Sequence, residues 1–436
     1  MKFKRGLKAN LIIIFILIVV LHVSTSFFVV NQELSTNLIE QLAYNDNYYE
    51  KFSGEKILLS STSENLNGNW GCLELKPFII QPSNDFIVNQ INHDELYKMF
   101  QSSKQWIFKN ANLNDVHSIF LKAGLNQEIC NKLLANTTTS HDGKSLVTTP
   151  PDAVLWRFTP EIRAKLYPLI GKHSDNEMYS QPICFNSNNS DEWLYKSSLS
   201  KKLLEKLSSL VYVEKEICYI SDIHLILPLI NTNDEQNDLL QTLYRTKALD
   251  VYLKIKEGQD VSKIADYWGN LGRNKLIKPM LERISENPRE GKINIAELLP
   301  TIPQNRLNTY SGIEEFEMDY KDCHWTTINF FNNAPDERYY MLPELFSFIK
   351  SISKPLKNAQ LKFGDIICIY DENNELTHSC TFIADNLVLT KNGMGNLKPF
   401  VLTYRDKTVP LYGNKTAYYS RTISNTRTVE SLKRVK

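Results

Sequence analysis

The sequence predicts an α+β fold, in which a mainly α-helical N-terminal and middle region precedes a C-terminal α+β domain with a small antiparallel sheet. Between residues 113 and 299, apolar side chains such as Val116 and Phe120 recur at the spacing of one helix face. Pro300 and Pro303 then disfavour further helix and mark a domain boundary. After them come short apolar runs separated by turn residues, which predict strands.

Length and composition limit the classes of protein that the chain can belong to. A chain of 436 residues exceeds what one ordinary core supports, so we expect two or three domains. Hydrophobic residues make up 42% and charged residues 23%, which is typical of a folded protein. The 50 basic and 49 acidic side chains leave no overall field that would attract nucleic acid. We therefore predict no nucleic-acid partner.

Residues 1–30 predict an export segment. Four basic side chains, at positions 2, 4, 5 and 8, precede the apolar run from Leu11 to Val23. Cleavage after Ser26 would release a secreted protein, although no Ala-x-Ala-like site is present. Alternatively, residues 11–30 stay as a signal anchor that is long enough to span a bilayer. We favour an exported protein anchored in the inner membrane and facing the periplasm or the extracytoplasmic side, with the membrane as its partner.

The chain between the export segment and the prolines carries no visible chemistry. Residues 31–112 are a mixed region of unknown role, and residues 113–303 form the predicted helical domain. Thr159, Pro160 and Glu161 are a strong helix start, because they supply a cap, the right φ and a favourable charge. Asp222 and His224 lie in an apolar stretch, and we interpret them as structural. Helices are predicted at 113–123, 159–171, 199–213, 234–256, 260–269 and 277–285.

Residues 304–421 carry the chemistry, and residues 422–436 are a polar, basic tail. Asp322 and Cys323 are followed by Trp325, Ile328 and Phe331 at helical spacing, which predicts a helix that begins at the cysteine. A helix N-terminus lowers the pKa of a thiol through its free amides and its dipole, and the thiolate is the reactive form. We therefore predict that Cys323 is a nucleophile.

The general base is predicted on a later strand. His378 lies in the run from Leu376 to Ile383, and the turn at Asp385 leads to a neighbouring strand that ends near residue 392. Thr390 and Asn392 share a face of that strand. We favour Asn392 as the group that orients His378, because an amide carbonyl accepts from the imidazole N–H. Thr390 stays open as the alternative.

This order of a helix-borne Asp-Cys, a Gly-Asp strand, a His strand and a strand with a polar end resembles the NlpC-type cell-wall peptidases, which have a papain-like fold. The resemblance covers about residues 306–421. It implies that Cys323 attacks an amide carbonyl, that His378 is its base and that Asn392 orients His378. It also implies a tyrosine at the oxyanion site, for which Tyr310 and Tyr320 are both candidates. The substrate it implies is the stem peptide of bacterial peptidoglycan.

The chain departs from the family at three places, one of which is the orienting residue, because Asn392 is displaced by two residues from where a simple count would put it. His324 and Trp325 stand where the family commonly has Ser-Gly, and Phe363 stands where it has proline before Gly364 and Asp365. An exported envelope scaffold or binding protein that kept the papain-like domain without catalysis is the alternative. In that case Cys323 is a small buried residue and His378 belongs to the core.

The seven cysteines include no CxxC pair, so the metal-site spacing is absent and we predict neither a metal nor a cofactor. An odd number leaves at least one thiol unpaired in an exported protein. Cys368 and Cys380 lie on adjacent predicted strands, where two buried thiols are favoured over a disulfide.

Overall fold

The computed structural model describes residues 51–59, 63–286, 291–311, 322–332, 335, 342–357, 360–393 and 395–422. Residues 51–436 form one compact unit. The export segment, Tyr320 and the tail after residue 422 lie outside the described residues, so those predictions stay as they are. Within the described ranges, no helix has both the length and the apolar character needed to cross a membrane.

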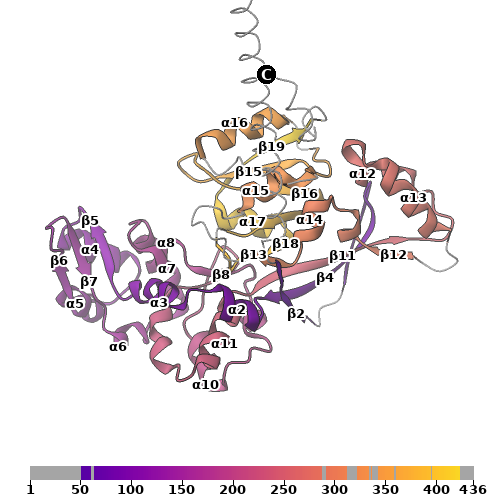
Figure 1. Cartoon of the computed structure of the whole chain (residues 1–436). Coiled ribbons are helices and arrows are strands. Elements are labelled where there is room, and N and C mark those ends of the chain that lie inside the picture. The colour runs from indigo at the N-terminus through magenta and orange to yellow at the C-terminus, as the bar shows by residue number, and fades with distance from the viewer. Residues whose placement is uncertain are drawn as a thin grey trace, which may run out of the picture. The chain divides into compact units, whose positions relative to one another are not determined.

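The α+β class is confirmed, but the prediction of a mainly helical N-terminal and middle region is wrong, because several antiparallel sheets run through that region (Figure 1). One sheet orders β5 (Trp106–Lys109), β7 (Ser145–Thr148) and β6 (Thr137–Thr139). Another orders β8 (Ile183–Phe185), β10 (Ile217–Ile220) and β9 (Tyr212–Glu214). A five-stranded sheet orders β12 (Gly291–Asn294), β11 (Thr246–Ile255), β4 (Gly71–Gln81) and β2 (Glu55–Leu58), with β3 (Glu64–Gly68) also paired to β4.

The largest error concerns residues 234–256, which were predicted as one helix. Helix α11 ends at Leu243, and β11 follows from Thr246 to Ile255. In the second half of β11, buried and half-buried side chains alternate, which is the period of a strand. The partner of this strand, β4, lies more than 160 residues earlier in the chain, so local periodicity could not reveal the pairing. Long-range pairing therefore overrides the helical pattern here.

The other predicted helices are present, but the one predicted at 199–213 is shorter, because α10 ends at Ser208 and residues 212 and 213 belong to β9. Helix α7 (Pro160–Gly171) begins as expected, because the Thr159 hydroxyl accepts a hydrogen bond from the backbone N–H of Ile162 at 3.4 Å. The prediction that Pro300 and Pro303 disfavour helix is wrong for the short helix α14 (Thr301–Arg306), because Pro300 caps it and Pro303 lies in its first turn, where proline is tolerated. The helices of this region are α2 (Asn84–Gln90), α3 (His93–Ser102), α4 (Leu113–Lys122), α5 (Gln127–Ala135), α6 (Asp152–Leu155), α7, α8 (Glu177–Ser180), α9 (Ser190–Leu194), α10 (Lys201–Ser208), α11 (Asn233–Leu243), α12 (Ser262–Trp268), α13 (Asn274–Ser285) and α14 (Thr301–Arg306).

The C-terminal part contains the predicted antiparallel sheet, which has six strands (Figure 1). The expected meander is present as β15 (Ile366–Tyr370), β16 (Leu376–Ala384) and β17 (Leu387–Lys391), which β18 (Phe400–Tyr404) extends, and the last strand, β19 (Lys415–Arg421), returns to pair with β15. Short strands β1 (Lys51–Ser53) and β13 (Thr309–Ser311) pair separately. The six strands in spatial order are β14 (Ser353–Pro355), β19 (Lys415–Arg421), β15 (Ile366–Tyr370), β16 (Leu376–Ala384), β17 (Leu387–Lys391) and β18 (Phe400–Tyr404). The helices are α15 (Cys323–Ile328), α16 (Leu342–Ile352) and α17 (Arg405–Tyr412).

The two faces of this sheet pack against different helices. On one face, Ile366 and Cys368 share a core with Ile328 of α15 and with residues of α16. On the other face, Ile367, Ile369 and Cys380 share a core with residues of α17. Antiparallel pairing sets Cys368 opposite Ser379 and Ile369 opposite His378. Ser379 therefore faces α15, whereas His378 faces α17.

The C-terminal sheet shares a core with the five-stranded sheet. Leu387, Leu389 and Leu402 belong to the same buried cluster as Leu73 and Val251 of the β4–β11 pair. Two hydrogen bonds reinforce this junction. The Tyr267 hydroxyl donates to the carbonyl of Ile383 at 2.7 Å, and the Asn270 amide donates to the carbonyl of Phe363 at 2.7 Å.

Gly413→Ala should destabilise the protein by about 2–3 kcal/mol, measured as the free energy of unfolding in urea. Gly413 has an extended backbone, so the constraint is one of space: an added Cβ would overlap the carbonyl oxygen of Tyr370. Gly143→Ala is the control, because the space around Gly143 is open and only its positive φ opposes the change, at about 1 kcal/mol. Equal losses in the two variants would contradict the close approach at Gly413.

Candidate active site

Cys323 is the first residue of α15, as the sequence predicts. Asp322 caps the helix, since its Oδ1 accepts from the backbone N–H of Trp325 at 2.8 Å. The hydroxyl of Thr326 donates to the Asp322 carbonyl at 2.7 Å. All six residues of α15 are buried, and the helix packs against β16 and β17. A local cap and tertiary packing therefore hold the thiol at the sheet.

Burial dominates the electrostatics of this thiol. Only 5% of Cys323 is exposed. Burial raises the pKa of Cys323 well above its usual value, and the neighbouring Asp322 carboxylate raises it further. Hydrogen bonds from the backbone N–H groups of Ser379 and His324 oppose the shift without reversing it. The thiol is therefore protonated at neutral pH, because desolvation outweighs the helix N-terminus.

His378 is fully buried on β16 and is held from two sides. Its Nε2 lies 2.8 Å from the Thr390 hydroxyl on β17. The ring stacks on Tyr412 of α17, with centroids 3.8 Å apart and planes 5° from parallel. Burial lowers the pKa of His378 well below its usual value, and the positive charge that His324 can carry lowers it further. His378 is therefore neutral at physiological pH.

The predicted dyad is not closed in this structure. Nδ1 of His378 is buried and has no hydrogen-bond partner among the described residues. No hydrogen bond between this nitrogen and Sγ of Cys323 is therefore present there. The register explains this arrangement, because α15 packs on the Ser379 face and His378 points to the α17 face. The structure thus brings the nucleophile to the right strand but leaves the base in a separate hydrogen-bonded setting.

The group that orients His378 is Thr390, the alternative that the sequence left open. Asn392 is 8% exposed, and its Oδ1 has no hydrogen-bond partner within the described ranges. Strand parity places both side chains on one face, so it could not choose between them. The choice depends on which of the two side chains lies level with His378. That alignment is set by the three-dimensional packing of β16 beside β17.

The oxyanion tyrosine is not located. Tyr310 lies on β13 inside the N-terminal core, where its ring packs 5.4 Å from that of Phe86. Its hydroxyl is buried without a hydrogen-bond partner in the described part of the chain. Tyr320 lies outside the described residues. Neither candidate therefore acquires a role in the site.

His324, which the sequence marked only as a departure from the family, is a buried member of the site. It is only 6% exposed, and its Nδ1 lies 2.9 Å from the Ser379 hydroxyl. Burial lowers the pKa of His324, whereas Asp322 raises it. Its position next to Cys323 could have marked His324 as a site residue. The sequence prediction instead sought the base on a later strand.

Asp322, Cys323 and His324 each offer one metal-ligand atom, and these atoms lie within 4.8 Å of one another. Carboxylate, thiolate and imidazole are the ligands that zinc prefers. However, the positive end of the helix dipole opposes a cation here. Asp322 and His324 are also committed to hydrogen bonds with Trp325 and Ser379. We therefore interpret the triple as the polar surroundings of a thiol.

A second buried polar cluster, in the middle of the chain, is structural. The Asp222 carboxylate accepts from Arg163 Nε at 3.2 Å and from the hydroxyls of Tyr167 and Tyr179. His224 Nδ1 lies 2.6 Å from the Ser103 hydroxyl. Asp222, Arg163 and His224 are all at most 1% exposed, which supports the structural interpretation of this stretch.

Comparison with known proteins adds no relative to this geometry. No protein-family model matches the chain, and neither the curated proteins nor the solved structures contain a significant match. The chemistry of the site must therefore be argued from its own residues. All seven cysteines are free thiols. Cys368 and Cys380 are two buried thiols, as expected.

The free energy of unfolding should fall as the pH drops below about 6.5. A histidine whose pKa is lower in the folded state takes up its proton mainly on unfolding, so stability is complete above the unfolded pKa and is lost below it. Each unit of depression corresponds to about 1.4 kcal/mol. His378→Asn should flatten the profile between pH 7.5 and 5 but not abolish it, because the pKa values of His224 and His324 are also lowered. Identical slopes for the parent and the variant would contradict this assignment.

Thr390→Val should cost about 1–3 kcal/mol of folding free energy, because it leaves Nε2 of a fully buried histidine without its partner. Thr390→Ser keeps a hydroxyl and should lose less. Asn392→Ala is the matched control, since its Oδ1 makes no hydrogen bond within the described ranges. Urea denaturation measures all three, and a larger loss in Asn392→Ala than in Thr390→Val would overturn the role of Thr390.

Proposed function

We propose that residues 304–421 form a papain-like, NlpC-type thiol hydrolase that cleaves a peptide or amide bond. The observation that supports the proposal best is that Cys323 heads a capped helix packed against β16. This is the strand that carries His378, whose Nε2 is held by a hydroxyl on the next strand. Nucleophile, base and orienting group thus follow one another in the order that the sequence resemblance implies.

Nδ1 of His378, which has no hydrogen-bond partner among the described residues, is available to accept a proton. In the reaction, Nδ1 would take the proton from the Cys323 thiol while the sulfur attacks the carbonyl carbon. The imidazolium would then return this proton to the departing amine, which leaves a thioester on the sulfur. Water, with His378 as base, would hydrolyse the thioester and release the acid. Thr390 holds the ring throughout, and backbone N–H groups at the start of α15 can stabilise the oxyanion.

In this proposal, the arrangement of Cys323 and His378 is the resting state of the enzyme. The thiol is buried and protonated, and the two reacting groups are not hydrogen-bonded. Catalytic hydrogen bonds are often long in the free enzyme and tighten only with substrate. Turnover requires that Sγ and Nδ1 approach to about 3–4 Å.

The substrate and location follow from the resemblance and from the N-terminal sequence. The enzyme would be exported, anchored in the inner membrane by residues 11–30 and active outside the cytoplasm, or secreted if the segment is cleaved. Its substrates would be peptidoglycan stem peptides or related amides. The proposed chemistry needs only protein groups, so it includes no cofactor.

One observation favours a second candidate, a non-catalytic envelope scaffold or binding protein. The thiol is 5% exposed and its pKa is raised rather than lowered, which is the setting of a structural cysteine. In this alternative, Cys323 serves packing and the domain binds cell-wall or protein ligands. Cys323→Ala would then leave both binding and phenotype unchanged.

Incubation of the full chain with purified peptidoglycan should release new amino groups, and Cys323→Ala should abolish the release. His378→Ala should reduce the rate at least a hundredfold, because it removes the general base. Cys368→Ala is the matched control: it removes another buried thiol of the same sheet and should retain activity. Equal release by Cys323→Ala and the parent would sink the hydrolase.

A thiol-directed probe should label Cys323 in a background in which the half-buried Cys72 and Cys184 are replaced by serine. Labelling should be slow at pH 7 and accelerate above pH 9, because burial raises the pKa of the Cys323 thiol. Mass spectrometry of peptides locates the adduct. Fast labelling at pH 7 would contradict the buried, protonated resting state, whereas it would leave the hydrolase itself standing.

A further inference from the structure

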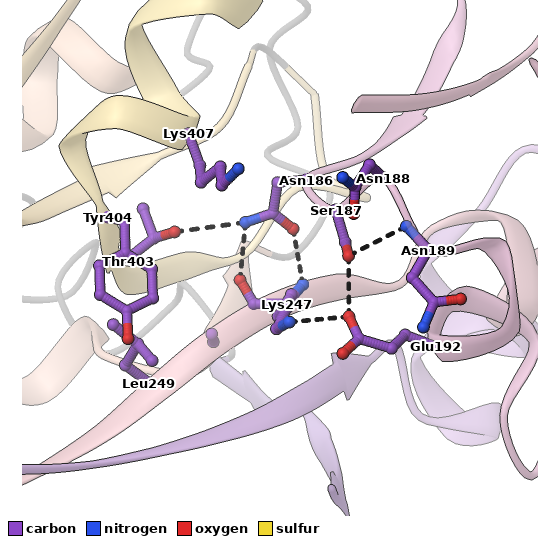
Figure 2. A pocket seen from close by; sticks show the side chains of 11 residues that line it. Asn186, Ser187, Asn188, Asn189, Glu192, Lys247, Leu249, Thr403, Tyr404 and Lys407 are labelled. Atoms are coloured by element: carbon purple, nitrogen blue, oxygen red, sulfur yellow. Dashed lines mark hydrogen bonds and ion pairs between the residues drawn. The ribbon is translucent and has the colours of Figure 1, made fainter. Parts of the chain in front are cut away.

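A polar pocket of about 280 Å³ lies where the middle of the chain meets the C-terminal sheet, and Cys323 is not among its lining residues (Figure 2). Its lining comes from five places: the loop after β8, the helix α9, the strand β11, the end of β18 and the first turn of α17. Because a liquid water occupies about 30 Å³, the pocket has room for one sugar ring or one amino acid.

Hydrogen bonds within the protein hold the wall of this pocket in place. The side-chain amide of Asn186 bridges the backbone of Lys247, since Oδ1 accepts from its N–H and Nδ2 donates to its carbonyl, both at 2.8 Å. The same Nδ2 donates to the Thr403 hydroxyl at 3.2 Å. Asn186 is 8% exposed, so this wall joins β11 to β18 through buried hydrogen bonds.

One side of the pocket holds an ordered charge cluster. Glu192 Oε2 accepts from Lys247 Nζ at 2.7 Å and from the Ser187 hydroxyl at 2.8 Å. These contacts use only one oxygen of Glu192, so its second oxygen and the remaining protons of the Lys247 ammonium can serve a ligand. The cluster thus offers both acceptor and donor groups to a hydroxylated molecule.

Lys407 adds a positive charge to the lining, beyond the ion pair of Glu192 with Lys247. Within the described ranges, its ammonium has neither an acidic nor a hydrogen-bonding partner, and Figure 2 shows its amine end turned toward Asn186. The lining therefore carries two positive charges, on Lys407 and Lys247, against one negative charge on Glu192, a net charge of one positive. An unpaired ammonium in a concave site favours an anion.

We propose that this pocket binds a small hydroxylated carboxylate of the size and type of a sugar acid. Lys407 would pair with the carboxylate, while Glu192, Lys247 and the amides of the wall would hydrogen-bond the hydroxyl groups. Ala248 and Leu249 provide an apolar floor for the ring carbons. The proposal is independent of thiol chemistry, because neither Cys323 nor His378 lines the pocket.

Saturation-transfer NMR with the full chain tests the proposal by comparing glucuronate with glucose, which lacks the carboxylate. Glucuronate should bind at millimolar concentration or tighter, at least about tenfold more tightly than glucose, and more weakly as salt is added. Equal binding of the two sugars, or no binding of glucuronate at about 20 mM, would overturn the proposal.

Three variants locate the binding. Lys407→Ala should weaken glucuronate about tenfold, whereas Lys407→Arg and the control Lys354→Ala, at an exposed lysine on β14, should keep it. Glu192→Gln should strengthen glucuronate several-fold, because it frees the Lys247 charge while keeping an acceptor. A structural defect would only weaken binding, so this rise separates charge recognition from misfolding. Unchanged affinity in Lys407→Ala, or weaker affinity in Glu192→Gln, would exclude this pocket as the site.

Discussion

The antiparallel pairing of β4 with β11 is the interaction on which the rest of the structure depends. Nine residue pairs, from Cys72–Lys254 to Ile80–Thr246, join segments that lie more than 160 residues apart. One half of this two-stranded ribbon, with Phe78 and Ala248, belongs to the N-terminal core. The other half, with Leu73 and Leu253, belongs to the core shared with the C-terminal sheet. A single ribbon thus supports both cores (Figure 1).

This ribbon also explains where both candidate sites lie. The C-terminal sheet packs on it through Leu387, Leu389 and Leu402. Lys247, on the same strand β11, gives the polar pocket its backbone anchor for Asn186. The thiol site and the pocket are therefore built on one framework, although they share no lining residue. Substitutions in β11 would be expected to affect both.

At the thiol site, desolvation and hydrogen bonding compete, and their magnitudes decide the protonation state. A helix N-terminus and two backbone N–H groups favour the thiolate of Cys323, but full burial disfavours any charge and prevails. The same burial keeps His378 and His324 neutral. The thiol of Cys323 and the two imidazoles are therefore all uncharged in this buried site. Access of substrate or solvent would therefore change the chemistry more than any single substitution of a neighbour.

Local signals in the sequence were enough for several features. Asp322 before an apolar helical pattern predicted the start of α15, and the turn residues after Tyr370 and Ala384 predicted the meander of β15, β16 and β17. These features depend on caps, turns and periodicity within about ten residues. The α+β class and the position of Cys323 at the start of a helix therefore followed from the sequence by itself.

Only the tertiary structure decided the rest, because it depends on partners far away in the chain. Distant β4 made residues 246–255 a strand instead of a helix. The register between β15 and β16 turned His378 toward α17, and the packing of β17 selected Thr390 over Asn392. Burial against β16 reversed the expected effect on the Cys323 pKa. The sequence determined which groups could react, whereas long-range packing determined which face, which partner and which protonation state each of them has.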